Sequence, residues 1–213
     1  MFLVFLPRRH VFETIAPYYD FLVDLFSFGF YARFLKKAIR ILAPSEGEKV
    51  LELCSGTGRV ASWIARSVGD RGRVIGMDLA PEMVETAERR YGNRENLIFL
   101  EQDVTEPWTI REPLDAVFTS FAVHELSEEG RMRTFERSYT TLNKDGRLVI
   151  ADFDPQVSGM GGIILRIFFE IVERPNLDFL SFKQEELLTQ IGFKRIQTVP
   201  VLGGLLRITL ARK

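Results

Sequence analysis

The fold of this chain is decided by the stretch Val50-Leu51-Glu52-Leu53-Cys54-Ser55-Gly56-Thr57-Gly58-Arg59-Val60-Ala61. It is an apolar run that stops on small residues and resumes with helical spacing, so we expect a strand, a tight turn and a helix start. Gly56 and Gly58 remove side chains that would keep a ligand from the backbone, and a helix start offers unpaired N–H groups. The stretch therefore predicts a ligand site at the turn.

Glu52 is the unusual member of this stretch, because it places an acid inside an apolar strand. A carboxylate beside such a turn repels phosphate groups and attracts an ammonium group. We therefore expect the ligand to present positive charge at this end.

Composition limits the classes of protein that remain. The 213 residues are 46% hydrophobic and 27% charged, with a net charge of −1, which suits one α/β domain without general attraction to nucleic acid. The single cysteine excludes an internal disulfide, and His10 and His124 are too few for a Cys/His metal site. The first six residues lack the preceding basic charge of a signal peptide, and residues 160–172 are too short to span a bilayer. We expect a cytoplasmic protein without a metal ion.

Strand and helix patterns alternate along most of the chain. Residues 11–43 hold two helical patterns, separated by Ser27-Phe28-Gly29. Strands are then predicted at 49–53, 73–78, 97–102, 114–120 and 147–152, with helices at 81–91 and 127–142. Repeated strand–helix units of this length imply right-handed crossovers and a mostly parallel sheet with helices on both faces.

The end of the chain changes this rhythm. A glycine-rich apolar insertion and a polar helix at 183–191 precede two strands, 193–199 and 205–211, which only a short Gly203-Gly204 turn region separates. Because no crossover helix fits there, we expect a closing antiparallel hairpin. The predicted organisation is one domain with a helical lid at 1–45, a cofactor-binding core at 46–152, an insertion at 153–192 and the hairpin at 193–213.

Two further acids follow predicted strands, where ligands of parallel sheets bind. Asp78 ends the second strand, twenty residues after Gly58, and can accept hydrogen bonds from both hydroxyls of a ribose. Asp103 follows the third strand and can accept from the exocyclic amine of an adenine. Together with Glu52, these acids indicate a nucleoside that carries a cationic group rather than a pyrophosphate.

These motifs together resemble the class I S-adenosylmethionine-dependent methyltransferases. The similarity covers roughly Lys49 to Asp152, in five ordered blocks at 51–58, 76–83, 102–104, 114–117 and 142–148. The family usually has glycine where Cys54 stands, which leaves the fine geometry of the loop open. The resemblance implies a Rossmann-like sheet of seven strands, a single methyltransferase domain and S-adenosylmethionine as cofactor.

The resemblance also implies roles for individual residues. The loop residues would bind the methionine end of the cofactor and one acid would bind the ribose. The residues that follow the second and third strands would bind the adenine. In that order the predicted cofactor-binding residues are Glu52, Cys54, Ser55, Gly56 and Gly58; Asp78; and Leu79, Met83, Asp103 and Val104, with Phe121 lining the cavity. Ordinary core packing is the alternative for Met83.

Residues 12–35 are similar to the start of ubiquinone/menaquinone C-methyltransferases and phospholipid N-methyltransferases, through residues 15–20 and 25–29. In such enzymes this segment forms a lid, which makes Tyr19 a candidate to close on the cofactor carboxylate; a core position is its alternative. Many of the 18 phenylalanines fall in the lid and the insertion, which indicates an apolar, quinone- or lipid-like acceptor. Mutual packing, a homodimer and peripheral membrane contact stay open as other uses of these faces.

In-line methyl transfer needs mainly alignment, and a general base only where the acceptor must lose a proton. His124 is the candidate base and Asp152 a lesser one, while a structural role for His124 stays open. Two other functions stay open as well. One is a cofactor-binding or lipid-associated module without turnover. The other is an NAD(P)-dependent oxidoreductase, which the glycine pattern with Asp78 also fits, although Glu52 and the hairpin count against it.

Overall fold

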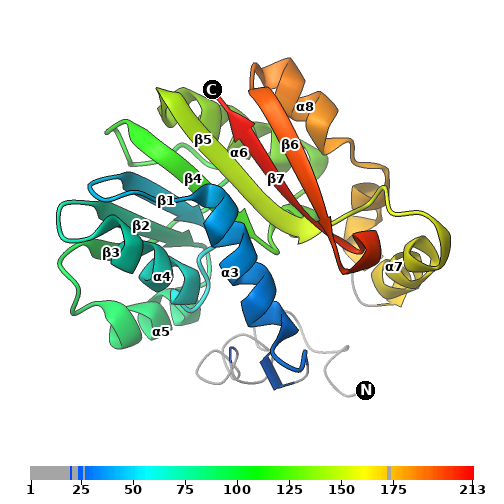
Figure 1. Cartoon of the computed structure of the whole chain (residues 1–213), viewed down its shortest axis with the longest axis horizontal. Coiled ribbons are helices and arrows are strands. Elements are labelled where there is room, and N and C mark those ends of the chain that lie inside the picture. Colours follow the sequence, from blue (N-terminus) through cyan, green and yellow to red (C-terminus); the bar gives the residue numbers. More distant parts are fainter. Residues whose placement is uncertain (1–19, 21–23, 26, 172–173) are drawn as a thin grey trace. The chain divides into compact units, whose positions relative to one another are not determined.

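A computed structural model of the chain describes residues 20, 24–25, 27–171 and 174–213. Its strands form a seven-stranded mixed sheet in the order β3-β2-β1-β4-β5-β7-β6, flanked by helices (Figure 1). The expected Rossmann-like architecture, mostly parallel with an antiparallel end, is confirmed. The chain divides into two compact units, the first ending at Val104 and the second beginning at Thr105.

The first unit contains the glycine turn and three parallel strands. Its elements are α3 (Phe30–Leu42), β1 (Lys49–Leu53), α4 (Arg59–Val68), β2 (Arg73–Asp78), α5 (Pro81–Tyr91) and β3 (Leu97–Glu101). In the register, Leu53 lies beside Met77 and Asp78 beside Glu101, so the three strands end at one edge. Residues 50–53 of β1 and 74–77 of β2 are all buried, as expected for parallel strands covered on both faces, whereas burial alternates along β3.

Local sequence explains where the helices of this unit begin and end. Helix α3 buries Phe34, Leu35, Ala38 and Leu42, which recur at helical spacing, and it stops at Ala43, whose φ of 49° is left-handed. Helix α5 begins with Pro81, whose missing N–H costs nothing in a first turn. Each predicted helix and strand of the described part of this unit is present, with β3 ending one residue earlier than expected.

The second unit carries the other half of the sheet. Its elements are β4 (Leu114–Ser120), η3 (Val123–Glu125), α6 (Glu128–Thr141), β5 (Leu142–Phe153), α7 (Gly159–Ile171), η4 (Arg174–Ser181), α8 (Gln184–Ile191), β6 (Lys194–Val201), η5 (Leu202–Gly204) and β7 (Leu206–Arg212). Ser127 was expected inside helix α6 but caps it, because its Oγ accepts the Gly130 N–H at 3.1 Å. The closing hairpin is confirmed, since β6 and β7 pair antiparallel.

Strand β5 is longer than the sequence predicts. It begins at Leu142 rather than at Arg147, because Leu142 pairs with Leu114 of β4, and it continues to Phe153 because β7 pairs with it that far. The strand thereby connects the parallel part of the unit to the antiparallel hairpin (Figure 1). No helix among the residues that the structure describes is long and apolar enough to cross a bilayer.

Candidate active site

The glycine turn after β1 is held by backbone hydrogen bonds. The Ser55 N–H donates to the Met77 carbonyl at 2.9 Å, and the Gly58 N–H donates to the Ser55 carbonyl at 3.0 Å. Gly56 has a φ of 52°, and a Cβ added there would meet no atom within 4 Å. Its side is therefore open to a ligand, as the sequence predicts.

Gly58 is required for a different reason than the one the sequence suggested. Its φ is 75°, and an added Cβ would lie 2.5 Å from the Phe99 ring and 2.8 Å from the Ala87 Cβ. These contacts come from β3 and α5, so a side chain at this position would collide with the protein itself. Gly58 allows the start of α4 to pack closely, whereas Gly56 leaves the open surface.

Cys54 occupies a backbone conformation that favours glycine. Its φ is 53°, in the left-handed region, where the Cβ of an L-residue crowds the backbone. This accounts for the glycine that the family usually has at this position, because the turn needs a residue that tolerates positive φ; nothing in the structure explains the cysteine in its place. Cys54 adopts the required conformation with strain that a glycine would not have.

Glu52 is buried with one oxygen that lacks a partner. Its side chain is 2% exposed, and Oε2 has no hydrogen-bond partner within the described part of the chain. Burial raises the pKa of Glu52 well above 4.5, a hydrogen bond from the Ala61 backbone opposes this, and the charges of Asp78 and Asp20 add to the rise. An ammonium group at Oε2 would satisfy the orphan oxygen and favour the ionised form. The site therefore fits the cationic methionine end of S-adenosylmethionine.

Asp78 is fixed at the end of β2 by backbone donors. Its Oδ2 accepts the Gly56 N–H at 2.7 Å, and its Oδ1 accepts the Ala80 N–H at 3.0 Å. Burial raises the pKa of Asp78, although the hydrogen bonds from the Ala80, Gly56 and Leu79 backbones counteract it. The carboxylate is thus held beside the glycine turn, and its role toward a ribose stays a prediction.

The apolar residues predicted for the adenine differ in exposure. Leu79 is 63% exposed directly after Asp78, which suits a platform for a flat ring, whereas Met83 is 5% exposed, as core packing would also give. Asp103 and the buried Val104 follow β3 in the same unit. Their roles stay predictions, and Tyr19 lies outside the described residues.

In the second unit, His124 and Asp152 form a buried dyad. The Nδ1 atom of the His124 ring lies 2.7 Å from Asp152 Oδ1. The backbone N–H of His124 donates to Asp152 Oδ2 at 3.2 Å. Because a carboxylate only accepts, Nδ1 carries a proton, so in the neutral imidazole Nε2 carries the lone pair. Both sequence candidates for proton transfer are therefore brought together.

Aromatic rings surround the His124 imidazole. Phe153 meets it edge-on at a centroid distance of 5.0 Å and Phe179 at 6.0 Å, while Phe121 packs against Phe153 at 5.6 Å. Phe121 has a φ of 49°, so the backbone is strained where it leaves β4 for η3. The imidazole of the dyad is thus in contact with aromatic rings, while Glu125 Oε1 lies 3.9 Å from its Nε2.

Sequence reasoning missed Arg131, a buried cation that supports the dyad's turn. Its Nε donates to the Val123 carbonyl at 3.0 Å and its Nη1 to Asp178 Oδ2 at 2.9 Å. The guanidinium lies over the Phe179 and Phe182 rings at 5.2 and 4.8 Å. Burial lowers the pKa of Arg131 and Asp178 opposes this. In the sequence, Arg131 belongs to a polar helix and gives no signal that it points inward.

Comparison with known proteins agrees with this geometry. Residues 8–172 match the ubiE/COQ5 methyltransferase family. The chain is 28% identical to the 2-phytyl-1,4-naphtoquinone methyltransferase of Thermosynechococcus vestitus, covering 95% of this chain and 97% of that one. It is 31% identical to the demethylmenaquinone methyltransferase of Thermus thermophilus, covering 76% and 73%.

Solved structures share the fold. A SAM-dependent methyltransferase from Aquifex aeolicus superposes with a TM-score of 0.62 at 22% identity, over 84% of this chain and 88% of that one. The match to an S-adenosylmethionine-dependent family decides against the oxidoreductase and against a binding module without turnover. The chain belongs to the ubiE/COQ5 methyltransferase family and is an S-adenosylmethionine-dependent methyltransferase.

Proposed function

We propose that this enzyme methylates a ring carbon of an apolar, quinone-like acceptor in its reduced, hydroxyl-bearing form. The relatives from Thermosynechococcus and Thermus are named for naphthoquinone and demethylmenaquinone acceptors. The aromatic surroundings of His124 suit such a ring. A ring carbon becomes nucleophilic when a neighbouring hydroxyl gives up its proton, so the acceptor chemistry calls for a base.

The observation that carries the proposal is the 2.7 Å contact between His124 Nδ1 and Asp152. Asp152 fixes the tautomer in which Nε2 can accept a proton, and it favours the imidazolium that results. In this mechanism Nε2 takes the hydroxyl proton of the acceptor. The ring carbon would then take the methyl group as the bond between that group and the sulfonium breaks, which leaves a neutral thioether. The ring carbon would afterwards lose its own proton to solvent, and the imidazolium would return its proton to the ring oxygen, so that the aromatic quinol and neutral His124 are restored.

The chain's residues have distinct tasks at the cofactor. Bound S-adenosylmethionine supplies an electrophilic methyl group on its sulfonium. Glu52 would hold the ammonium group, Asp78 the ribose hydroxyls and the open face of Gly56 the close backbone approach. None of these residues needs to transfer a proton, because alignment of donor and acceptor provides most of the rate.

Incubation with methyl-labelled S-adenosylmethionine and a demethylated naphthoquinol tests the proposal, with mass spectrometry locating the new methyl group. We expect methylation of a ring carbon under reducing conditions and none with the oxidised quinone. A product methylated on oxygen, or no product with any prenylated or phytylated quinol, would contradict the proposed acceptor.

The base is tested separately with His124→Gln, which keeps a polar side chain at this position. We expect kcat to fall about 100-fold or more, as is typical for loss of a general base, with cofactor affinity unchanged. Asp152→Asn should lower kcat through the wrong tautomer. Met132→Gln, an exposed change on α6, is the control. A variant at His124 with wild-type kcat would leave that residue a structural role only.

A further inference from the structure

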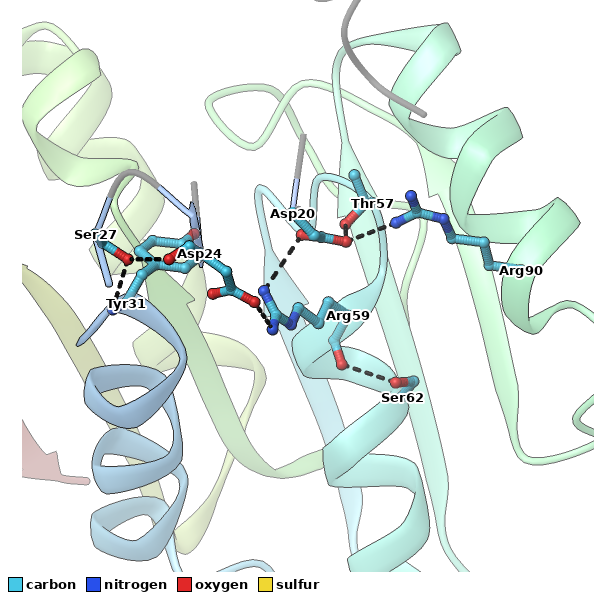
Figure 2. Close-up of polar contacts among 8 residues, drawn as sticks. All are labelled: Asp20, Asp24, Ser27, Tyr31, Thr57, Arg59, Ser62 and Arg90. Carbon is cyan, nitrogen blue, oxygen red and sulfur yellow. Dashed lines mark hydrogen bonds and ion pairs between the residues drawn. The ribbon is translucent and has the colours of Figure 1, made fainter. Parts of the chain in front are cut away.

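Two acids that precede α3 contact the region around the glycine turn: Asp20 reaches the turn and helices α4 and α5, and Asp24 reaches α4 (Figure 2). Asp20 Oδ2 accepts a hydrogen bond from Thr57 Oγ1 at 2.8 Å and one from Arg90 Nη1 at 2.6 Å. Arg59 Nη1 lies 3.9 Å from the other oxygen of Asp20. One carboxylate therefore contacts the turn, α4 and α5 at once.

Asp24 makes a different contact from the same region of the chain. Its Oδ2 accepts from Arg59 Nη2, while its carbonyl accepts the Gly29 N–H at 2.7 Å. Ser27 Oγ in turn accepts the Tyr31 N–H at 3.2 Å. Asp24 is thus connected to the start of α3 and to α4 but not, in any contact of the described residues, to the turn itself.

Thr57 is the point at which Asp20 reaches the cofactor site. It lies between Gly56 and Gly58 and is 4% exposed. A buried hydroxyl bonded to a carboxylate is fixed in orientation, and so is the backbone that carries it. The preceding residue, Gly56, donates its backbone N–H to Asp78.

We infer that Asp20 is a positioning residue for the cofactor. Its carboxylate accepts the hydrogen bond from Thr57 and so stabilises the turn in the conformation in which Gly56 and Asp78 bind the ligand. Arg59 and Arg90 hold Asp20 in turn, as Figure 2 shows. This goes beyond the proposed acceptor, because it concerns cofactor binding and holds whichever atom is methylated.

Calorimetry of S-adenosylmethionine binding to the full chain tests the inference. We expect Asp20→Asn and Thr57→Val each to weaken binding by roughly tenfold, the range for a charge-assisted hydrogen bond. Because both variants weaken the same hydrogen bond between Thr57 and Asp20, their losses should not add, and the double variant should bind about as weakly as the weaker of the two single variants. In assays, KM for S-adenosylmethionine should rise with kcat at saturation unchanged.

Matched variants separate positioning from a general effect of charge or folding. Asp24→Asn makes the same charge change nearby but leaves Thr57 bonded, so its affinity should stay within about threefold of wild type. Thr57→Ser keeps the hydroxyl and should restore binding. If Asp20→Asn fails to fold, the pair Thr57→Val and Thr57→Ser tests the same contact with Asp20 in place.

Three results would overturn the inference. These are wild-type affinity in Asp20→Asn or Thr57→Val, additive losses in the double variant, and a lowered melting temperature of Asp20→Asn without loss of cofactor affinity. The last result would give Asp20 a role in stability alone.

Discussion

The carboxylate of Asp78 accepts the Gly56 N–H at 2.7 Å, so the end of β2 and the glycine turn after β1 are directly connected. We expect Asp78→Ala to weaken S-adenosylmethionine binding by about 1–3 kcal/mol, because the ribose hydroxyls lose a charged acceptor. Titration calorimetry measures this. Asp70→Ala, an acid on the exposed turn after α4, should bind as wild type. Unchanged affinity in Asp78→Ala would refute the placement of the ribose.

Glu52 makes the stability of the cofactor-free enzyme depend on pH. Burial raises the pKa of Glu52 above its ordinary 4.5, so the folded chain holds this proton at pH values where the unfolded chain has lost it. Its contribution to stability is therefore complete below about pH 4.5 and is lost as pH rises through the folded-state value. Urea unfolding should show that Glu52→Gln becomes more stable, relative to wild type, as the pH is raised.

The same substitution, Glu52→Gln, should weaken the binding of S-adenosylmethionine. The glutamine carries no negative charge to pair with the ammonium group, so we expect the free energy of S-adenosylmethionine binding to weaken by about 1.5–3 kcal/mol near neutral pH. In wild type the affinity should rise with pH as Glu52 ionises, and in Glu52→Gln this rise should disappear. Parallel pH profiles in the two proteins would show that another group carries the dependence.

Much of the fold follows from local sequence. Hydrophobic period, the Pro81 start and the short Gly203-Gly204 turn predict the strands, a helix and the hairpin that the structure contains. The early start of β5 was not predictable, because it depends on the pairing of Leu142 with Leu114, which lies far away in sequence. Long-range pairing overrides local pattern at such ends.

The candidate site likewise contains residues that local sequence indicates and contacts that it does not. Glu52, Asp78 and His124 were identifiable because acids and a histidine stand at or after strands. The partners of Asp20 were not, since its contacts with Thr57 and Arg90 join residues 37 and 70 positions apart. Side-chain contacts of this kind leave no periodic mark on the sequence.

Cys54 offers a test of backbone strain. A left-handed conformation lowers the stability of an L-residue's folded state by about 1–2 kcal/mol. Replacing the residue by glycine removes this strain, but the greater freedom of glycine in the unfolded state offsets roughly 0.5–1 kcal/mol of the gain. We expect Cys54→Gly to raise the free energy of unfolding by about 0.5–1 kcal/mol, measured by urea denaturation. Cys54→Val should lower it, because β-branched residues disfavour positive φ. Equal stabilities for the two variants would mean that strain at φ 53° is not what distinguishes this position.

Gly56 and Gly58 should respond differently to alanine, although both have positive φ. A Cβ at Gly56 meets no atom, so Gly56→Ala should lose only about 1–2 kcal/mol of stability from strain while blocking the close approach of the cofactor. A Cβ at Gly58 meets Phe99 and Ala87, so Gly58→Ala should lose about 2–4 kcal/mol through overpacking added to strain. Urea denaturation and calorimetry on the same preparations separate these effects. The reverse order, with Gly56→Ala the less stable variant or with unchanged cofactor affinity in it, would contradict the assignment of Gly56 to the ligand and Gly58 to packing.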